Sequence, residues 1–356
     1  MKIALITDSH FGARSESMAF NDFFFKFWES TFFPYIEKHD IKNIIHLGDV
    51  VDRRKFMNYV IMNSMRTRFI DRIGKIGCHM DVIVGNHDVP YRNTNTPNAI
   101  EEMFGSREYI NVISGPITKI YDGLPIAIIP WINSSNHQDT LDLIKNTPAN
   151  IAMGHLEISG FEMDKGNIIN TGMDRDTFKK FETVYSGHFH HKSTDGHIFY
   201  LGNLFEITWS DYNDKRGFHV FDTDTRSIEF IENPHHMFHK LEYDDTVETI
   251  ESVEEKDFAH YHNNILKVIV KKKTNPVLFD QFMEKLYSAQ PLDIAIVEDF
   301  IEYNELSEDD IIDQADSTTT IVDKYIDSID MGLDRDKLKN LMREIYNQAQ
   351  NLESSQ

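Results

Sequence analysis

The stretch Val82-Ile83-Val84-Gly85-Asn86-His87-Asp88 decides the fold class. It is a β-rich apolar run that ends in a glycine, and three polar residues come directly after that glycine. Four other runs also end in polar side chains: Asp8 and His10 follow Lys2 to Thr7, Gly48-Asp49 follows Asn43 to Leu47, Gly154-His155 follows Asn150 to Met153, and Gly187-His188-Phe189-His190 follows Thr183 to Ser186. Loops at the carboxyl ends of strands in an α/β sheet converge on one crevice, so we expect these side chains to meet.

The residue types at these strand ends indicate a metal centre. They are aspartate, asparagine and histidine, without sulfur, and this set suits two divalent ions such as Mn²⁺ better than a structural zinc site. A single histidine after a strand is more often an ordinary loop residue, but five strand ends with compatible donors argue for a shared purpose. Cys78 is the sole cysteine, which excludes an internal disulfide, and we expect it in the core.

The composition sets limits on the class of protein. The chain has 356 residues, with 36 Lys and Arg against 58 Asp and Glu, a formal charge of −22. This length suits about two domains. The absence of a long apolar run excludes a membrane span, and the first residues read as a buried strand, not as a secretory signal, so we expect a cytoplasmic protein. The negative charge argues against autonomous binding of duplex DNA, whose affinity comes from Lys and Arg.

Composition and periodicity divide the chain into four segments. Residues 1–235 alternate β-rich runs with helical stretches and predict a layered α/β domain, and residues 236–300 predict a small α+β domain. Residues 301–317 form an acidic linker, and residues 318–356 are expected to be helical. The phenylalanines between Met18 and His39 fall at helical spacing and either pack in the core or contribute to a dimer interface.

The last segment carries an apolar helical face, formed by Leu338, Leu341, Met342, Ile345 and Leu352. Such a face needs to be covered. It either folds back on its own chain or docks on a partner, and we favour a partner because a flexible acidic linker precedes it.

Taken together, the motifs resemble those of a known family. Asp8-x-His10, Gly48-Asp49-x-x-Asp52-Arg53, Gly85-Asn86-His87-Asp88, Gly154-His155 and Gly187-His188-x-His190 are similar in order and spacing to the calcineurin-like metallophosphoesterases. Longer stretches resemble the nuclease subunits of recombination and double-strand-break repair complexes, the SbcD and Mre-eleven group with its T-even-type phage members: Ile129-Pro130-Trp131, Tyr200-Leu201-Gly202-Asn203 and Lys215-Arg216-Gly217-Phe218.

The resemblance implies a fold and a pair of metal sites. The fold would be an α/β β-sandwich flanked by helices, with a small α+β capping domain and a C-terminal helical tail. One ion would be held by Asp8, His10, Asp49 and His190, and the other by Asp49, Asn86, His155 and His188. Asp49 would bridge the two ions, most simply Mn²⁺, with Mg²⁺ as an alternative.

The resemblance also assigns catalytic roles to His87 and Asp52. His87 would stabilise the transition state or protonate the leaving oxygen, and Asp52 would orient it and raise the pKa of its imidazole. Position 52 departs from the repair nucleases, which often carry a histidine there, and the following Arg53 is as in the phosphatases.

The implied function is a metal-dependent DNA nuclease, an exonuclease on duplex ends and an endonuclease on single strands. Its partners would be DNA, a second copy in a homodimer, and an SMC/ABC-type ATPase with a long coiled coil. Arg53, Arg54 and Arg92 are candidate DNA contacts. A stand-alone metallophosphatase acting on phosphoprotein or nucleotide would also suit the Asp49 to Arg53 segment, but it needs neither the second domain nor the tail. A non-catalytic scaffold is opposed by the complete donor set.

Overall fold

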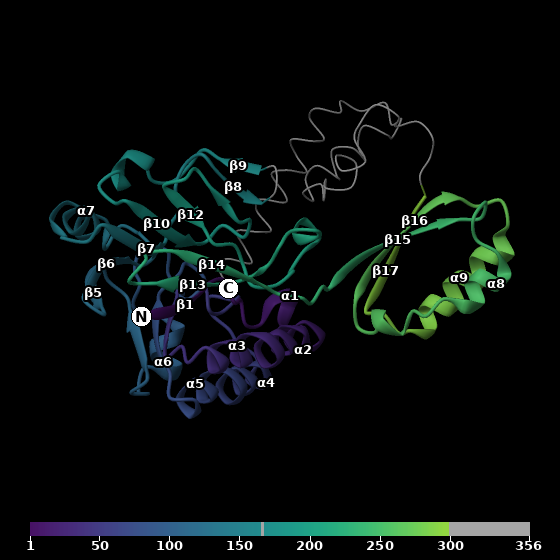
Figure 1. The fold of residues 1–356 in the computed structure, drawn as a ribbon, viewed down its shortest axis with the longest axis horizontal. Coiled ribbons are helices and arrows are strands. Elements are labelled where there is room, and N and C mark those ends of the chain that lie inside the picture. Colours follow the sequence, from purple (N-terminus) through teal and green to yellow (C-terminus); the bar gives the residue numbers. More distant parts are fainter. Residues whose placement is uncertain (165–166, 299–356) are drawn as a thin grey trace, which may run out of the picture. The chain divides into compact units, whose positions relative to one another are not determined.

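The structure is a computed structural model that describes residues 1–164 and 167–298 (Figure 1). The acidic linker at 301–317 and the predicted partner-binding face from Leu338 to Leu352 lie outside the described residues. None of the helices in the described ranges is long and apolar enough to cross a membrane.

Two six-stranded sheets form the first part of the chain. The first sheet has the order β14-β13-β1-β2-β3-β4. Its strands are β1 (Lys2–Ile6), β2 (Asn43–His46), β3 (His79–Ile83), β4 (Ile110–Ile113), β13 (Gly217–Asp222) and β14 (Ile228–Glu232). Strands β1 to β4 are parallel, and β13 pairs antiparallel with both β1 and β14.

The second sheet has the order β11-β12-β10-β7-β6-β5. Its strands are β5 (Ile117–Tyr121), β6 (Leu124–Ile129), β7 (Ile151–His155), β10 (Thr183–Gly187), β11 (Ser193–Thr194) and β12 (Ile198–Tyr200). The four inner strands are parallel, and the edge strands β5 and β11 are antiparallel to their neighbours. A short hairpin, β8 (Phe161–Asp164) with β9 (Asn167–Ile169), follows β7.

The two sheets pack face to face through alternate residues of their strands. Ile3 and Leu5 of β1 lie in one buried cluster with Ile128 and Met153 of the second sheet, whereas Ala4 and Ile6 belong to a second cluster shared with the helices. This period of two is what a strand buried on both faces requires. The β-sandwich flanked by helices is therefore confirmed.

Helices cover the outer faces of both sheets (Figure 1). On the first sheet these are α1 (Ala13–Glu16), α2 (Met18–Phe27), a π-helical turn (Trp28–Phe32), α3 (Phe33–Lys38), α4 (Tyr59–Ser64), a second π-helical turn (Met65–Ile70), α5 (Asp71–Lys75) and α6 (Ala99–Phe104). On the second sheet they are α7 (His137–Asn146) and a 3₁₀ turn (Arg175–Phe178).

The phenylalanines of α2 are core residues of their own chain. Phe24 stacks on Phe205 with ring centroids 4.1 Å apart, and Phe27 is fully buried. Of the two alternatives for these side chains, core packing is the one the structure supports. Pro34 lies in the first turn of α3, directly after the first π-helical turn. Cys78 is buried, as expected.

A three-stranded parallel sheet follows, with strands β15 (Phe238–Asp244), β16 (Ile265–Lys272) and β17 (Asp293–Glu298). Helices α8 (Ile250–Glu255) and α9 (Pro276–Ser288) pack on it around a separate apolar cluster that includes Tyr243, Val268 and Phe282. This is the predicted small α+β unit, although no local pattern indicated β15 or the helix α8 inside the acidic stretch.

Candidate metal centre

Several of the side chains at the strand ends are presented by backbone in an unusual conformation. Four predicted ligands have a positive φ: Asp8 at 49°, His10 at 40°, Asp49 at 54° and His188 at 88°. Such conformations cost about 1–3 kcal/mol each and persist only where their surroundings fix them. Gly48 has a φ of +100°, and a Cβ on it would lie 2.5 Å from Nδ1 of His155, so a larger residue would not fit.

One donor group consists of Asp8, His10 and His190. One ligand atom from each lies within 4.8 Å of the others. Nε2 of His10 is 3.1 Å from Nε2 of His190 and 3.9 Å from Oδ1 of Asp8. Asp8 is fixed by hydrogen bonds from the Thr7 hydroxyl and from the main-chain N–H of His188. The first set of predicted ligands therefore converges.

A second donor group consists of Asp49, His155 and His188. Oδ2 of Asp49 is 3.2 Å from Nε2 of His155, and Oδ1 of Asn86 is 3.0 Å from the same nitrogen. Oδ2 of Asp49 is also 4.0 Å from Nε2 of His10, which belongs to the first group. Asp49 thus belongs to the second group and also faces the first, as a ligand shared by two ions has to do.

The chemistry of these donors fits a cation. Nδ1 of His155 lies 2.7 Å from the carbonyl oxygen of Leu47, which can only accept, so Nδ1 carries the hydrogen. In the neutral ring Nε2 then presents a lone pair to Asp49 and Asn86, whose oxygens are themselves acceptors. A hydrogen-bonded second ring nitrogen that fixes the tautomer is the usual setting of a metal-binding histidine.

The electrostatics of the site also favour a bound cation. Burial alone would lower the pKa of His155, but Asp49 and Asp8 outweigh it and raise the pKa to about 9. At His10, burial is likewise outweighed by Asp52, Asp49 and Asp8, and the pKa is again about 9. The carboxylates therefore create a potential that favours added positive charge in a buried place.

Asp88 links the loop after β2 to the loop after β3 through hydrogen bonds. Its carboxylate, which is fully buried, accepts main-chain hydrogen bonds at 2.8–3.1 Å from the loops after β2 and β3, donated by Asp49, Val50, Val51 and Gly85. Burial, followed by the nearby Asp49 carboxylate, raises the pKa of Asp88 to about 6. Asp88 thereby places Asp49 against Asn86 and His87.

His87 lies beside the first donor group and contacts Asp52 through the main chain of that residue. Its ring centroid is 5.0 Å from that of His10. Nδ1 of His87 donates to the main-chain oxygen of Asp52 at 2.6 Å, whereas the Asp52 carboxylate lies 3.5 Å from Nδ1 of His10. Burial lowers the pKa of His87. Asp52 therefore contacts His87 through its carbonyl group, and it acts to raise the pKa of His87, but burial outweighs that effect.

A buried arginine supports the first donor group and was missed as a site residue. Arg216 donates to the main-chain oxygen of His190 and to Oδ1 of Asn203, and it pairs with Asp211 at 2.7 Å and Asp214 at 2.8 Å. It is 5% exposed. In the sequence, this region stands out only through its resemblance to the family, in the stretches Tyr200 to Asn203 and Lys215 to Phe218. The structure shows that each stretch supplies a donor to the main-chain oxygen of His190, Asn203 from the first and Arg216 from the second.

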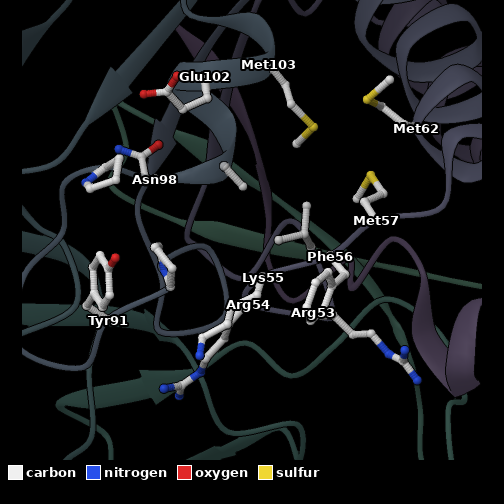
Figure 2. A pocket seen from close by; sticks show the side chains of 14 residues that line it. Arg53, Arg54, Lys55, Phe56, Met57, Met62, Tyr91, Asn98, Glu102 and Met103 are labelled. Atoms are coloured by element: carbon white, nitrogen blue, oxygen red, sulfur yellow. The ribbon is translucent and has the colours of Figure 1, made fainter. Parts of the chain in front are cut away.

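Two of the candidate DNA contacts, Arg53 and Arg54, line a cleft beside the centre. The cleft has a volume of about 590 Å³, and Arg53, Arg54, Lys55, Met57, Met62, Tyr91 and Met103 are among its lining residues. Figure 2 shows the methionines together on one side and the guanidinium groups of Arg53 and Arg54 directed away from them. Among the described residues, Arg53, Arg54 and Arg92 form no ion pair. Burial and the nearby Arg92 lower the pKa of Arg54.

Residues 1–192 match the family model of the calcineurin-like phosphoesterases. The chain is also similar to Exonuclease subunit 1 of Enterobacteria phage T4, with 30% identity over 317 residues that span 88% of this chain and 90% of that protein. The chain belongs to the calcineurin-like phosphoesterases. The predicted family is thereby confirmed.

A second relative of this phosphoesterase is the D subunit of the SbcCD nuclease of Staphylococcus epidermidis, 26% identical over 218 residues that span 56% of this chain and 55% of that protein. The match to the family model includes all seven predicted ligands, and Arg216 lies beyond it. Membership implies divalent metal ions, which agrees with the two donor groups.

Proposed function

We propose that this phosphoesterase is the nuclease subunit of a DNA recombination and repair complex. It hydrolyses DNA phosphodiesters, as an exonuclease on duplex ends and an endonuclease on single strands, in the cytoplasm of the host cell. The observation that carries the proposal is the convergence of two donor groups on either side of Asp49. The names of two relatives, an exonuclease subunit and a nuclease subunit, support DNA as the substrate.

Seven side chains of this chain would hold the metal pair. Asp8, His10, Asp49 and His190 would bind one divalent ion, most simply Mn²⁺, and Asp49, Asn86, His155 and His188 the other. Two such ions supply Lewis-acid polarisation of a phosphodiester and an activated water. Within the chain, Asp88 and Arg216 hold the ligand-bearing loops in place.

His87 would act on the reacting phosphodiester directly. Its Nδ1 is engaged by the main-chain oxygen of Asp52, and its main-chain N–H donates to Oδ1 of Asp49 at 2.8 Å. These contacts fix the ring and leave Nε2 as the ring nitrogen available to a substrate. We assign His87 to the stabilisation of the transition state or of the leaving oxygen, and Asp52 to the positioning of His87 through its carbonyl group.

Local positive charge would bind the DNA backbone in spite of the overall charge of −22. Arg53 and Arg54 follow Asp52, and Arg92 follows the loop that carries His87. All three arginines are therefore close in the chain to residues of the centre. Arginines that no carboxylate neutralises, in a chain so acidic, are suited to phosphate groups.

An exposed apolar surface next to the cleft would serve the homodimer. Phe56 is 67% exposed, Tyr59 82% and Val60 54%. These three side chains precede or begin α4, next to the methionines of the cleft. Contiguous exposed apolar residues of this kind are typical of a protein interface, and we propose that a second copy covers them.

The capping segment at 236–300 and the helical segment at 318–356 would serve the remaining partners. We propose that the first contributes to DNA recognition and that the second, after the linker at 301–317, docks on an SMC/ABC-type ATPase. The name of the T4 relative identifies that protein as one subunit of a larger assembly.

A paired assay tests the nuclease assignment. Single-stranded circular DNA and p-nitrophenyl phosphate are offered with Mn²⁺ or Mg²⁺ to the wild type and to His87→Ala, with His79→Ala as the matched control at the opposite end of β3. We expect cleavage of DNA that is lost in His87→Ala while metal content persists. Hydrolysis of the monoester alone would replace the proposal by a stand-alone phosphatase, and neither activity would indicate a scaffold.

A further inference from the structure

A recess lined in part by Trp131 and Glu157, which both lie against His188, borders the second donor group. It has a volume of about 280 Å³, and its walls include Trp131, Ile132, Glu157 and Met173, with Ser134 among its exposed lining residues. Its size is close to the lower end of the range for small-molecule sites. The roles assigned so far make no use of it.

Trp131 joins this recess to the metal centre. Its ring centroid is 5.0 Å from that of His188 and 6.2 Å from that of His155, and the side chain is half-buried. One part of the indole therefore packs on the donor histidines while another lines the recess. A group held against this indole would be adjacent to whatever the second donor group binds.

The backbone of Trp131 is held firmly. Its N–H donates to the carbonyl oxygen of Val84 at 2.8 Å, and its carbonyl oxygen accepts from Nδ2 of Asn95 at 2.8 Å and of Asn136 at 2.9 Å. The opposite wall is held as well, because the N–H of Met173 donates to the carbonyl oxygen of Glu157 at 2.8 Å. A flat surface fixed in this way loses little entropy when a planar ligand stacks on it.

We propose that the recess is a nucleobase subsite, in which the base of the nucleotide at the cleaved phosphate stacks on Trp131. The proposal rests on the proposed function in so far as the ligand is a nucleotide. Stacking on an aromatic ring depends on the π-face that every base has, so the subsite would accept all bases. It would require the base to leave a duplex stack, and single strands and frayed ends meet this requirement most easily.

The test compares two ligands that share a phosphate and differ in the base. Binding of dAMP and of 2-deoxyribose 5-phosphate to the full chain with Mn²⁺ is measured by calorimetry. We expect the wild type to prefer dAMP by between about 5-fold and about 150-fold, the range that base stacking provides. Trp131→Ala should abolish this preference and leave the affinity for the sugar phosphate unchanged, whereas Trp131→Phe should keep most of the preference.

Two further variants distinguish loss of the subsite from a folding defect. Ser134→Trp places a large side chain at the exposed rim of the recess, and it should also remove the preference for dAMP. Ile120→Ala, which removes an exposed apolar side chain on β5, should change nothing. All variants are checked for wild-type melting temperatures.

Three results would overturn the subsite. These are equal binding of both ligands by the wild type, equal weakening of both by Trp131→Ala, and an unchanged preference in Ser134→Trp. Equal weakening would mean that Trp131 only positions His188. A preference for dAMP in a protein that cleaves no DNA would instead refute the proposed nuclease function and leave the subsite intact.

Discussion

The guanidinium of Arg216 donates to the main-chain oxygen of His190, a predicted ligand that lies 26 residues earlier in the chain. The same side chain neutralises Asp211 and Asp214 in a nearly solvent-free place. The position of one ligand of the first donor group thus depends on a residue that is not itself a predicted ligand.

Arg216→Lys is expected to keep the charge but lose the fork that serves four acceptors at once. Loss of such a supporting contact typically weakens metal binding by about 10- to 100-fold, and we predict this loss for Mn²⁺ at the first donor group. Titration calorimetry on the folded variant measures it, with Arg226→Lys at an exposed ion pair as the control. Wild-type affinity in Arg216→Lys would show that the contact has no role in metal binding.

This arginine illustrates what the sequence could not reveal. The ligands themselves were predictable because each follows a β-rich run, and the run and its polar end are adjacent in the chain. The partner of Arg216 is a main-chain oxygen brought near by the packing of two sheets, and no local pattern encodes that contact.

Asp52 shows the same limit of the sequence. Its side chain and its carbonyl group point to two different histidines, His10 and His87. A motif shows that Asp52 and His87 are neighbours but not which atoms meet. The edge strand β11 was missed for a different reason, because two polar residues carry no alternation that would distinguish them from a loop.

The burial of His219 leads us to predict a loss of folding stability at acidic pH. This side chain on β13 is 5% exposed, and its burial, with a smaller effect of Lys192, lowers its pKa to about 3. An unfolded histidine titrates near 6.5, so below that pH the unfolded chain takes up a proton that the folded chain refuses. The stability is therefore full above about pH 6.5 and declines as the pH falls toward 3.

Between pH 7.5 and pH 5 this single residue should cost the wild type about 2 kcal/mol. Urea unfolding with EDTA at both pH values, for the wild type and His219→Leu, measures the difference, and only the change with pH is interpreted. His262→Leu, at an exposed position, is the control. A variant that loses as much stability in acid as the wild type would contradict the assignment.

The proposed dimer surface predicts a monomeric variant. Tyr59→Glu places a charge where an exposed apolar ring is proposed to become buried, and combination with Phe56→Ser removes the neighbouring ring. Light scattering after gel filtration should give the mass of a dimer for the wild type and of a monomer for the double variant. Tyr287→Glu is the matched control, and a wild type that is monomeric at all concentrations would refute the surface.

Removal of the residues after Ser317 should separate two activities. The shortened chain retains every proposed ligand, so we expect wild-type Mn²⁺-dependent cleavage of single-stranded circular DNA. Stimulation of exonuclease activity by ATP, measured with the ATPase present, should be lost because the docking segment is gone. Undiminished stimulation would refute the docking of residues 318–356 on the ATPase.

The number of manganese ions per chain tests the central claim most directly. We predict two ions by calorimetry and metal analysis for the wild type, one each for His10→Ala and His155→Ala, and a loss of affinity at both sites for Asp49→Asn, the residue between the groups. His79→Ala should still bind two. One ion or none in the wild type, or two undisturbed ions in Asp49→Asn, would contradict a pair of cations bridged by Asp49.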